Sequence, residues 1–245
     1  MTTAVAKKKP AASTAVAVVD YEAELARMQE KLGAPSGNKI KVTQAKSFEL
    51  TDGSEVESLD LVIVDFISRN EYYEGAYNPK EITPPVCVAI HPIPTEMAPA
   101  AESPDKQCET CAACPMNQFG SKGAGKACKN TRLLAVLPPD ATADTPIQLL
   151  SVAPTAIKGF DRFISHLATA HKKLPAMVVV TVGFSPSVDH SQLVFSDPAP
   201  LEKDVAAMML SRREEAMKLL TVVPDMTVVE KQTKAPARRP AGRGR

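Results

Sequence analysis

The chain has 245 residues, of which 44% are hydrophobic and 23% are charged, and its formal net charge is +1. This composition supports a folded core and excludes a mainly disordered chain, and the length fits one domain with tails or two small domains. No apolar run approaches the ~18 residues of a membrane helix, so we expect no association with a membrane.

The N-terminal segment is low in complexity. Residues 1–17 are rich in Ala and contain three consecutive lysines, which predicts a disordered tail. Apolar residues at helical spacing predict a short helix over residues 20–32. Because the chain carries no apolar export segment at its start, we expect reduced thiols and a cytoplasmic setting.

Strands dominate the prediction for the first half of the chain. The alternating stretch over residues 39–50 predicts one strand, followed by a turn at Thr51–Gly53. Residues 59–67 (LDLVIVDFI) are strongly apolar and predict a strand at the centre of a sheet, and residues 86–90 (VCVAI) predict a short strand.

Three of the four tyrosines lie close together in the sequence, just after the apolar strand. Tyr72, Tyr73 and Tyr77 follow Arg69, an arrangement that would suit the stacking of nucleic-acid bases at ~1–3 kcal/mol per base. The alternative is that these rings pack under a loop and form local hydrogen bonds. The sequence favours the two interpretations about equally.

All five cysteines of the chain lie in one stretch of 46 residues, from Cys87 to Arg132. Two overlapping C-x2-C pairs are followed by a glycine-rich loop and one more cysteine, and this spacing predicts a metal site. A tight turn directs two thiolates at one ion, and Zn²⁺ takes about four such ligands in a tetrahedron. The cysteines are Cys87, Cys108, Cys111, Cys114 and Cys128.

Five thiols for four positions leave three assignments open. The most compact set uses Cys108 together with Cys111, Cys114 and Cys128. A second set replaces Cys108 by Cys87 and resembles a zinc knuckle. In the third, the C-x2-C-x2-C-P run holds an iron–sulfur cluster. We favour zinc over iron–sulfur, and we interpret His166 and His171 as surface residues rather than ligands.

A glycine-rich, basic loop lies between the last two cysteines. Its glycines would let the backbone approach a phosphate, which nearby lysines would neutralise. The loop is not a Walker motif, because Ala127 stands where Ser or Thr is required after Lys126. The alternative is a solvated loop without a ligand. Candidate phosphate contacts are Arg69, Lys122, Lys126, Lys129 and Arg132, and candidate stacking residues are Phe119 and the three tyrosines.

The second half of the chain alternates strands and helices. A helix capped by Thr155 is predicted over residues 156–171, and an amphipathic helix over 201–220. The basic, Pro-rich tail at residues 223–245 predicts disorder. Strands are predicted over residues 132–137, 147–152, 177–184 and 192–196.

This order of elements favours an α+β, mainly β fold over a doubly wound sheet. We expect an OB-like barrel over residues 18–222, with a zinc-binding loop inserted at residues 87–132, flanking helices and disordered tails.

The residues also carry a resemblance. The pattern PPVC…CAACPMNQFGSKGAGKACKNTRLLAVL, with DFISRNEYYEGAYNP upstream and VAPTAIKGFDRFISHL downstream, resembles single-stranded-DNA-binding proteins of bacteriophages. The similarity covers roughly residues 59–195. It implies an OB fold with structural zinc on Cys87, Cys111, Cys114 and Cys128, which leaves Cys108 as the spare thiol. The basic C-terminus departs from the acidic tail usual in that group.

From the resemblance we expect a non-catalytic single-stranded-DNA-binding protein of phage replication or recombination. Its setting would be the host cytoplasm, and its partners would include replication or recombination proteins. The alternatives are a zinc- or iron–sulfur-containing nuclease and an interaction module of a replication or transcription complex. Because no His or carboxylate motif accompanies the cysteines, a closed structural metal site is favoured over a catalytic one.

Overall fold

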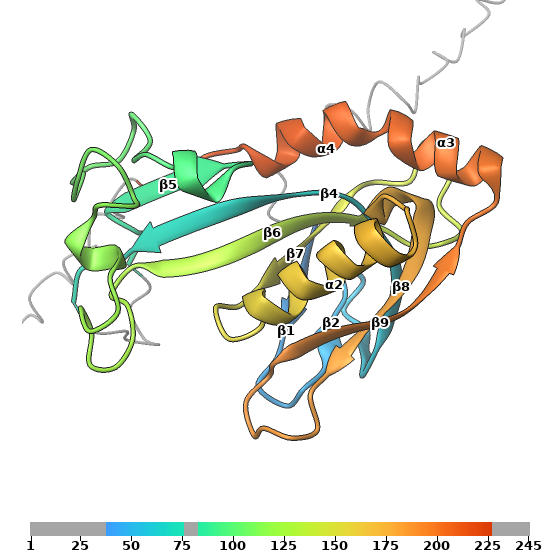
Figure 1. Ribbon diagram of the computed structural model, residues 1–245, viewed down its shortest axis with the longest axis horizontal. Coiled ribbons are helices and arrows are strands. Elements are labelled where there is room, and N and C mark those ends of the chain that lie inside the picture. Colours follow the sequence, from blue (N-terminus) through green and yellow to red (C-terminus); the bar gives the residue numbers. More distant parts are fainter. Residues whose placement is uncertain (1–37, 76–82, 227–245) are drawn as a thin grey trace, which may run out of the picture. The chain divides into compact units, whose positions relative to one another are not determined.

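The computed structural model describes residues 38–75 and 83–226, which belong to a compact unit that begins at Asn38. The described part is a mixed α+β fold built on a strongly curled, half-barrel sheet (Figure 1). Its strands are β1 (Lys39–Val42), β2 (Phe48–Glu49), β3 (Glu55–Val56), β4 (Leu59–Tyr72), β5 (Cys87–His91), β6 (Lys129–Leu137), β7 (Gln148–Val152), β8 (Val178–Phe184) and β9 (Leu193–Pro200).

The strands follow the order β3-β2-β1-β7-β6-β4-β8-β9, and β5 pairs with β4. Only the β1–β7 pair is parallel among the described strands, and all other pairs are antiparallel. The long strand β4 joins the parts of the sheet, because β6 runs along one edge of β4 while β8 and β5 share the other.

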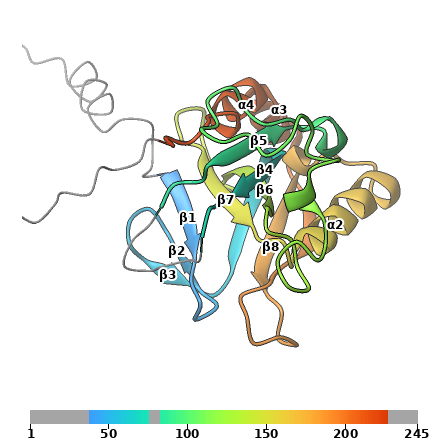
Figure 2. The ribbon, with the colours of Figure 1, turned by 90° about the vertical axis from the view of Figure 1, so that its left-hand side faces the viewer.

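A β-bulge between Ile63 and Asp65 bends β4. Side chains of successive strand residues point to opposite faces, so the two faces of the sheet can be followed along β4 and β6. Leu134 and Val136 belong to one buried cluster, and Leu133 and Ala135 belong to another. We call these the α2 face and the α3–α4 face, after the helices that cover them (Figure 2).

The helix α2 (Ile157–Ala170) closes the α2 face. It buries Phe160 and Leu167 there, and Ile164 packs against the same cluster, as the 3–4 spacing of its apolar residues predicts. Phe160 meets Phe66 of β4 edge to face, at 5.1 Å between ring centres.

Two short helices, α3 (Lys203–Ser211) and α4 (Arg213–Leu220), cover the other face. Met209, Ala216 and Leu220 are buried against it. The single helix predicted over residues 201–220 is wrong, because the helix is interrupted at Arg212. The guanidinium group of Arg212 donates hydrogen bonds of 3.0 Å to the carbonyl oxygen of Thr145.

Two other local predictions are wrong. The predicted strand over residues 39–50 is a hairpin, β1 and β2, because Lys46 adopts a left-handed backbone conformation (φ 59°) and turns the chain. Thr155 does not cap α2, whose N-cap is Ala156 without a side-chain hydrogen bond. The strands predicted within residues 59–67, 86–90, 132–137, 147–152, 177–184 and 192–196 are confirmed as β4 to β9, and β4 and β9 extend further than expected.

The helix predicted over residues 20–32 and most of both predicted tails lie outside the described residues. Within residues 38–75 and 83–226, no helix has the length and apolar character needed to span a membrane.

Candidate metal centre and nucleic-acid interface

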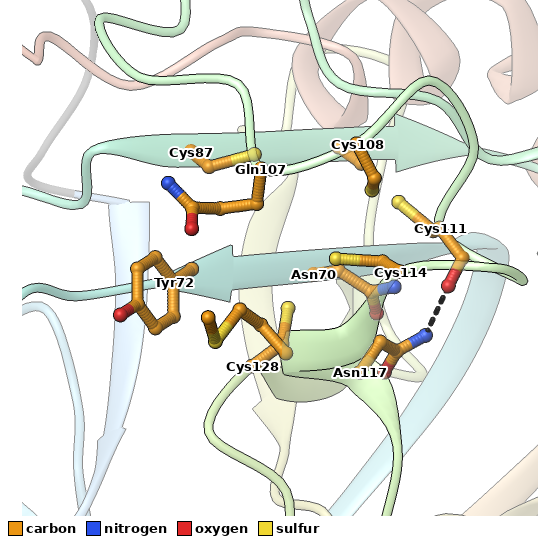
Figure 3. A pocket seen from close by; sticks show the side chains of 11 residues that line it. Asn70, Tyr72, Cys87, Gln107, Cys108, Cys111, Cys114, Asn117 and Cys128 are labelled. Carbon is orange, nitrogen blue, oxygen red and sulfur yellow. Dashed lines mark hydrogen bonds between the residues drawn. The ribbon is translucent and has the colours of Figure 1, made fainter. Parts of the chain in front are cut away.

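The five cysteines meet at one end of the sheet. Cys87 is the first residue of β5 and pairs with Tyr72 at the end of β4, while Cys128 directly precedes β6. The other three lie in the long loop of residues 92–128 that joins β5 to β6. Figure 3 shows the five side chains lining one pocket with Asn70 and Tyr72 of β4. The convergence predicted from the cysteine spacing is therefore present, with every thiol free.

Backbone hydrogen bonds fold the cysteine loop onto itself. The Cys111 N–H donates to the carbonyl oxygen of Met97 (2.9 Å), and the Cys128 N–H donates to that of Met116 (2.8 Å). The Asn117 side-chain amide donates to the carbonyl oxygen of Cys111 at 2.8 Å. A single 3-10 turn, η3 (Pro115–Asn117), follows Cys114. These bonds bring the two ends of the loop together.

The apolar contacts that support this loop are few. Its buried cluster consists of Ala89, Met97 and Cys111 alone, whereas the two faces of the sheet bury large clusters. The loop contains two single 3-10 turns, η2 (Pro94–Glu96) and η3, and no longer helix or strand, and loops of this length are uncommon in compact domains. Small apolar cores of this kind usually depend on disulfides or metal ions for their stability.

The pocket has the donor chemistry of a structural metal site. Cys87, Cys111, Cys114 and Cys128 are buried and Cys108 is half-buried, and no His, Asp or Glu side chain lines the pocket. The volume of the whole pocket is about 10 Å³, which is room for about one atom of the size of a water oxygen.

Burial controls the ionisation of these thiols. It raises the pKa of Cys108 and of Cys128 to about 12 and also raises the pKa of Cys111, and the neighbouring thiols add to the effect. Burial therefore favours the neutral thiol at Cys108, Cys111 and Cys128, and a cation placed among them would favour the thiolate.

As they stand, the described residues contain no group of three or more Cys, His, Asp or Glu side chains arranged to hold a metal ion. The five thiols share a pocket, but their side chains are not arranged around a common point as metal ligands are.

The tip of the cysteine loop exposes an aromatic ring. Phe119 is 78% exposed, and the ammonium group of Lys126 lies 5.1 Å from the centre of its ring. Gly120 and Gly123 have positive φ angles of 91° and 59°, and Lys122 forms a β-bridge with Gly125, so the glycines shape a narrow hairpin-like turn. The structure thus brings three predicted contacts together: Phe119, Lys122 and Lys126.

A second group of predicted residues lies on the α3–α4 face, next to the same end of the sheet. Arg69 and Tyr73 point to this face together with Glu71, which accepts hydrogen bonds from both. Lys129 stands opposite Glu71 in the β4–β6 register and therefore shares their face. Burial, followed by the nearby Glu71 carboxylate, raises the pKa of Tyr73 to about 12.

Three predicted residues belong to neither group. Tyr72 lines the cysteine pocket rather than the surface. Arg132 is on the α2 face, where it donates to both carboxylate oxygens of Asp161 (3.2 and 3.0 Å) and to the hydroxyl of Ser68 (2.8 Å). Its guanidinium group is thus engaged within the protein. Tyr77 lies outside the described residues.

Two residues of these sites, Glu71 and Asn70, were not among the predicted ones. Glu71 positions Arg69 and Tyr73, and Asn70 lines the cysteine pocket and accepts a hydrogen bond from the Asn130 side chain (2.8 Å). The period-two alternation of a strand, applied to residues 69–73, was a signal that could have found both, because it separates Arg69, Glu71 and Tyr73 from Asn70 and Tyr72.

Comparison of the chain with protein-family models, with curated proteins and with solved structures gives no match. The resemblance to phage single-stranded-DNA-binding proteins therefore rests on the motif residues alone.

Proposed function

We propose that this protein binds single-stranded DNA without catalysis, in phage replication or recombination, and that zinc stabilises its cysteine loop. The proposal rests on the position of the exposed Phe119 and the half-buried Lys126 at the tip of a loop whose base is lined by all five thiols. A ring that stacks bases and lysines that neutralise phosphates are the two elements of non-specific strand binding.

Zinc would act on the cysteine loop as a structural cross-link. Cys87, Cys111, Cys114 and Cys128 are the buried members of the set and would hold the ion, with Cys108 at the edge of the pocket. The four thiols already line one pocket, and rotation of their side chains between staggered rotamers is one way in which they could turn towards a shared ion. Bound zinc would keep its ligands as thiolates and would offset the burial that raises the pKa of Cys111 and Cys128.

The curled sheet supports an OB-like interpretation of the fold. The described sheet is half-closed, and all its strand pairs except β1–β7 are antiparallel. One helix, α2, packs against the α2 face. These features are compatible with a barrel that carries an inserted loop. The cysteine loop then occupies the position of an elongated loop between two strands.

The lining of the pocket favours this structural role over a hydrolytic one. Catalytic zinc usually has a His or carboxylate ligand and an open position for water, and neither residue type lines the described pocket. A nuclease is therefore the weaker candidate.

A filter-binding titration of a labelled single-stranded oligonucleotide over a series of salt concentrations tests the function. We expect log K to fall linearly with log[salt], with a slope near ~0.7 per neutralised phosphate, and the oligonucleotide to remain intact. Cleavage of the strand would favour the nuclease, and the absence of binding at low salt would refute the proposal.

A further inference from the structure

A second cavity lies on the α3–α4 face, on the side of the sheet opposite α2. Its volume is about 280 Å³. Leu133 and Leu149 contribute apolar surface, and the hydroxyl groups of Thr131 and Ser151 lie on the same sheet face. The cavity is at the lower limit of ligand-pocket sizes, so it suits one small group rather than an extended molecule.

Two cations, one carboxylate and one aromatic ring line this cavity, and the Glu71 carboxylate is paired with the Arg69 guanidinium. Lys39 is exposed, Arg69 is half-buried, and the ring of Tyr73 is 37% exposed. Glu71 holds the last two in place, because its carboxylate accepts one hydrogen bond from the Arg69 guanidinium and another, of 3.2 Å, from the Tyr73 hydroxyl. The ring is therefore positioned before any ligand arrives.

Arg69 retains an unused donor. Its Nε is buried and has no hydrogen-bond partner, the only such side-chain atom in the described part of the chain. Buried donors without partners are costly in folded proteins, and a functional site is one common explanation. A planar group placed against Tyr73 with an attached anion near the exposed ammonium group of Lys39 would use the accessible features of the cavity.

We propose that this cavity is a nucleotide subsite, which takes one nucleotide of a single DNA strand with its base against Tyr73 and its phosphate towards Lys39. The inference rests on the proposed function and adds a second contact to it. The loop tip with Phe119 belongs to the cysteine loop, which lies at the end of the sheet. A DNA strand that contacts both Phe119 and Tyr73 must therefore cross the end of the sheet where β4, β5 and β6 meet.

The subsite makes the affinity depend on the length of the oligonucleotide and on the Tyr73 ring. An oligonucleotide of a few residues occupies one of the two contacts, whereas a long one occupies both and binds more tightly. Removing the Tyr73 ring should therefore weaken the binding of a 25-residue oligothymidylate by about 5- to 160-fold, as expected for one stacked base.

The chain contains four Tyr and no Trp, so its tyrosine fluorescence can be followed, and the difference between the unmodified chain and Tyr73→Phe isolates the contribution of Tyr73. We would titrate the full chain and its Tyr73→Ala, Tyr73→Phe and Lys39→Ala variants with dT25. Each titration would follow both the quenching of tyrosine fluorescence and the anisotropy of an end label. Tyr73→Phe retains the ring and is the matched control, and exposed Lys39 can be replaced without disturbing the fold.

We expect weaker binding for Tyr73→Ala and Lys39→Ala, and near-normal binding with reduced quenching for Tyr73→Phe. Wild-type affinity in both Tyr73→Ala and Lys39→Ala would overturn the subsite while leaving the proposed function intact. If the unmodified chain fails to bind dT25 at low salt, the proposed function fails and the subsite with it.

Discussion

The ammonium group of Lys126 lies over the ring of Phe119 and also donates a 3.3 Å hydrogen bond to Oδ1 of Asn117. Asn117 in turn donates to the carbonyl oxygen of Cys111, which lines the cysteine pocket. The exposed tip of the loop is thus connected to the thiols by successive contacts. A change that loosens the cysteine pocket should therefore also loosen the positions of Phe119 and Lys126 at the tip.

Replacing Phe119 by Ala should weaken single-stranded DNA binding by ~1–3 kcal/mol, the value of one stacked base. The ring is 78% exposed, so the free energy of unfolding should change little. Anisotropy titrations and thermal unfolding measure the two effects. Leu174→Ala is the matched control, since Leu174 is another exposed apolar side chain, 49% exposed, on a different part of the chain. Equal affinities for Phe119→Ala and Leu174→Ala would exclude the ring from the interface.

Lys122→Ala and Lys129→Ala should each lower the salt dependence of DNA binding. Both side chains are exposed, and each lost phosphate contact should reduce the slope of log K against log[salt] by ~0.7. Fitting the slopes of the variants and of the unmodified chain measures this. Unchanged slopes would place both lysines outside the interface.

Arg132→Ala should behave differently from the lysine variants. Its guanidinium group is bound to Asp161 and Ser68, so its loss should lower the free energy of unfolding by about 1–3 kcal/mol and leave the salt slope unchanged. Urea unfolding monitored by circular dichroism gives the first quantity. A reduced salt slope with unaltered stability would instead identify Arg132 as a phosphate contact.

Cys114→Ser should lower the zinc content and the melting temperature together, whereas Cys108→Ser should retain the metal. Cys114 is buried in the pocket, and Cys108 is the half-buried fifth thiol. Elemental analysis combined with a thermal melt tests the pair. Visible absorption distinguishes colourless zinc from a coloured iron–sulfur cluster. Loss of metal in Cys108→Ser with retention in Cys114→Ser would reverse the ligand assignment.

Tyr73 should ionise late in an alkaline titration. Burial and the Glu71 carboxylate raise its pKa to about 12 from the ordinary value of 10, so the folded state favours the neutral phenol. Its contribution to stability is therefore present below pH 10 and is lost as the pH rises through about 12.

Absorbance of the phenolate at 295 nm follows this ionisation. The late step should be absent in Tyr73→Phe and should shift to lower pH in Glu71→Gln. A titration curve unaffected by Glu71→Gln would show that the carboxylate does not act on Tyr73.

Much of the fold could be predicted from local patterns. The apolar run at residues 59–67 and the spacing of Ile157, Phe160 and Leu167 predict β4 and α2 because burial imposes those periods. The split of residues 39–50 could not be predicted, since nothing in the pattern indicates the left-handed conformation of Lys46.

In the candidate sites, too, local sequence patterns predict some contacts, whereas contacts made by tertiary packing cannot be predicted from them. Cysteine spacing predicts that the thiols meet, because short C-x2-C turns are local constraints. The partner of Arg132 lies 29 residues away on α2, and only the packing of that helix brings Asp161 to it. Tyr72 and Tyr73 are neighbours in sequence, but strand alternation directs them to opposite faces.

The most direct test is the affinity of the purified protein for a labelled 25-residue single-stranded DNA before chelation, after zinc has been removed, and after zinc is restored. We expect one zinc ion per chain, binding that weakens severalfold on removal, and recovery on restoration. A folded protein that contains no metal as purified and does not bind the oligonucleotide at low salt would contradict the account.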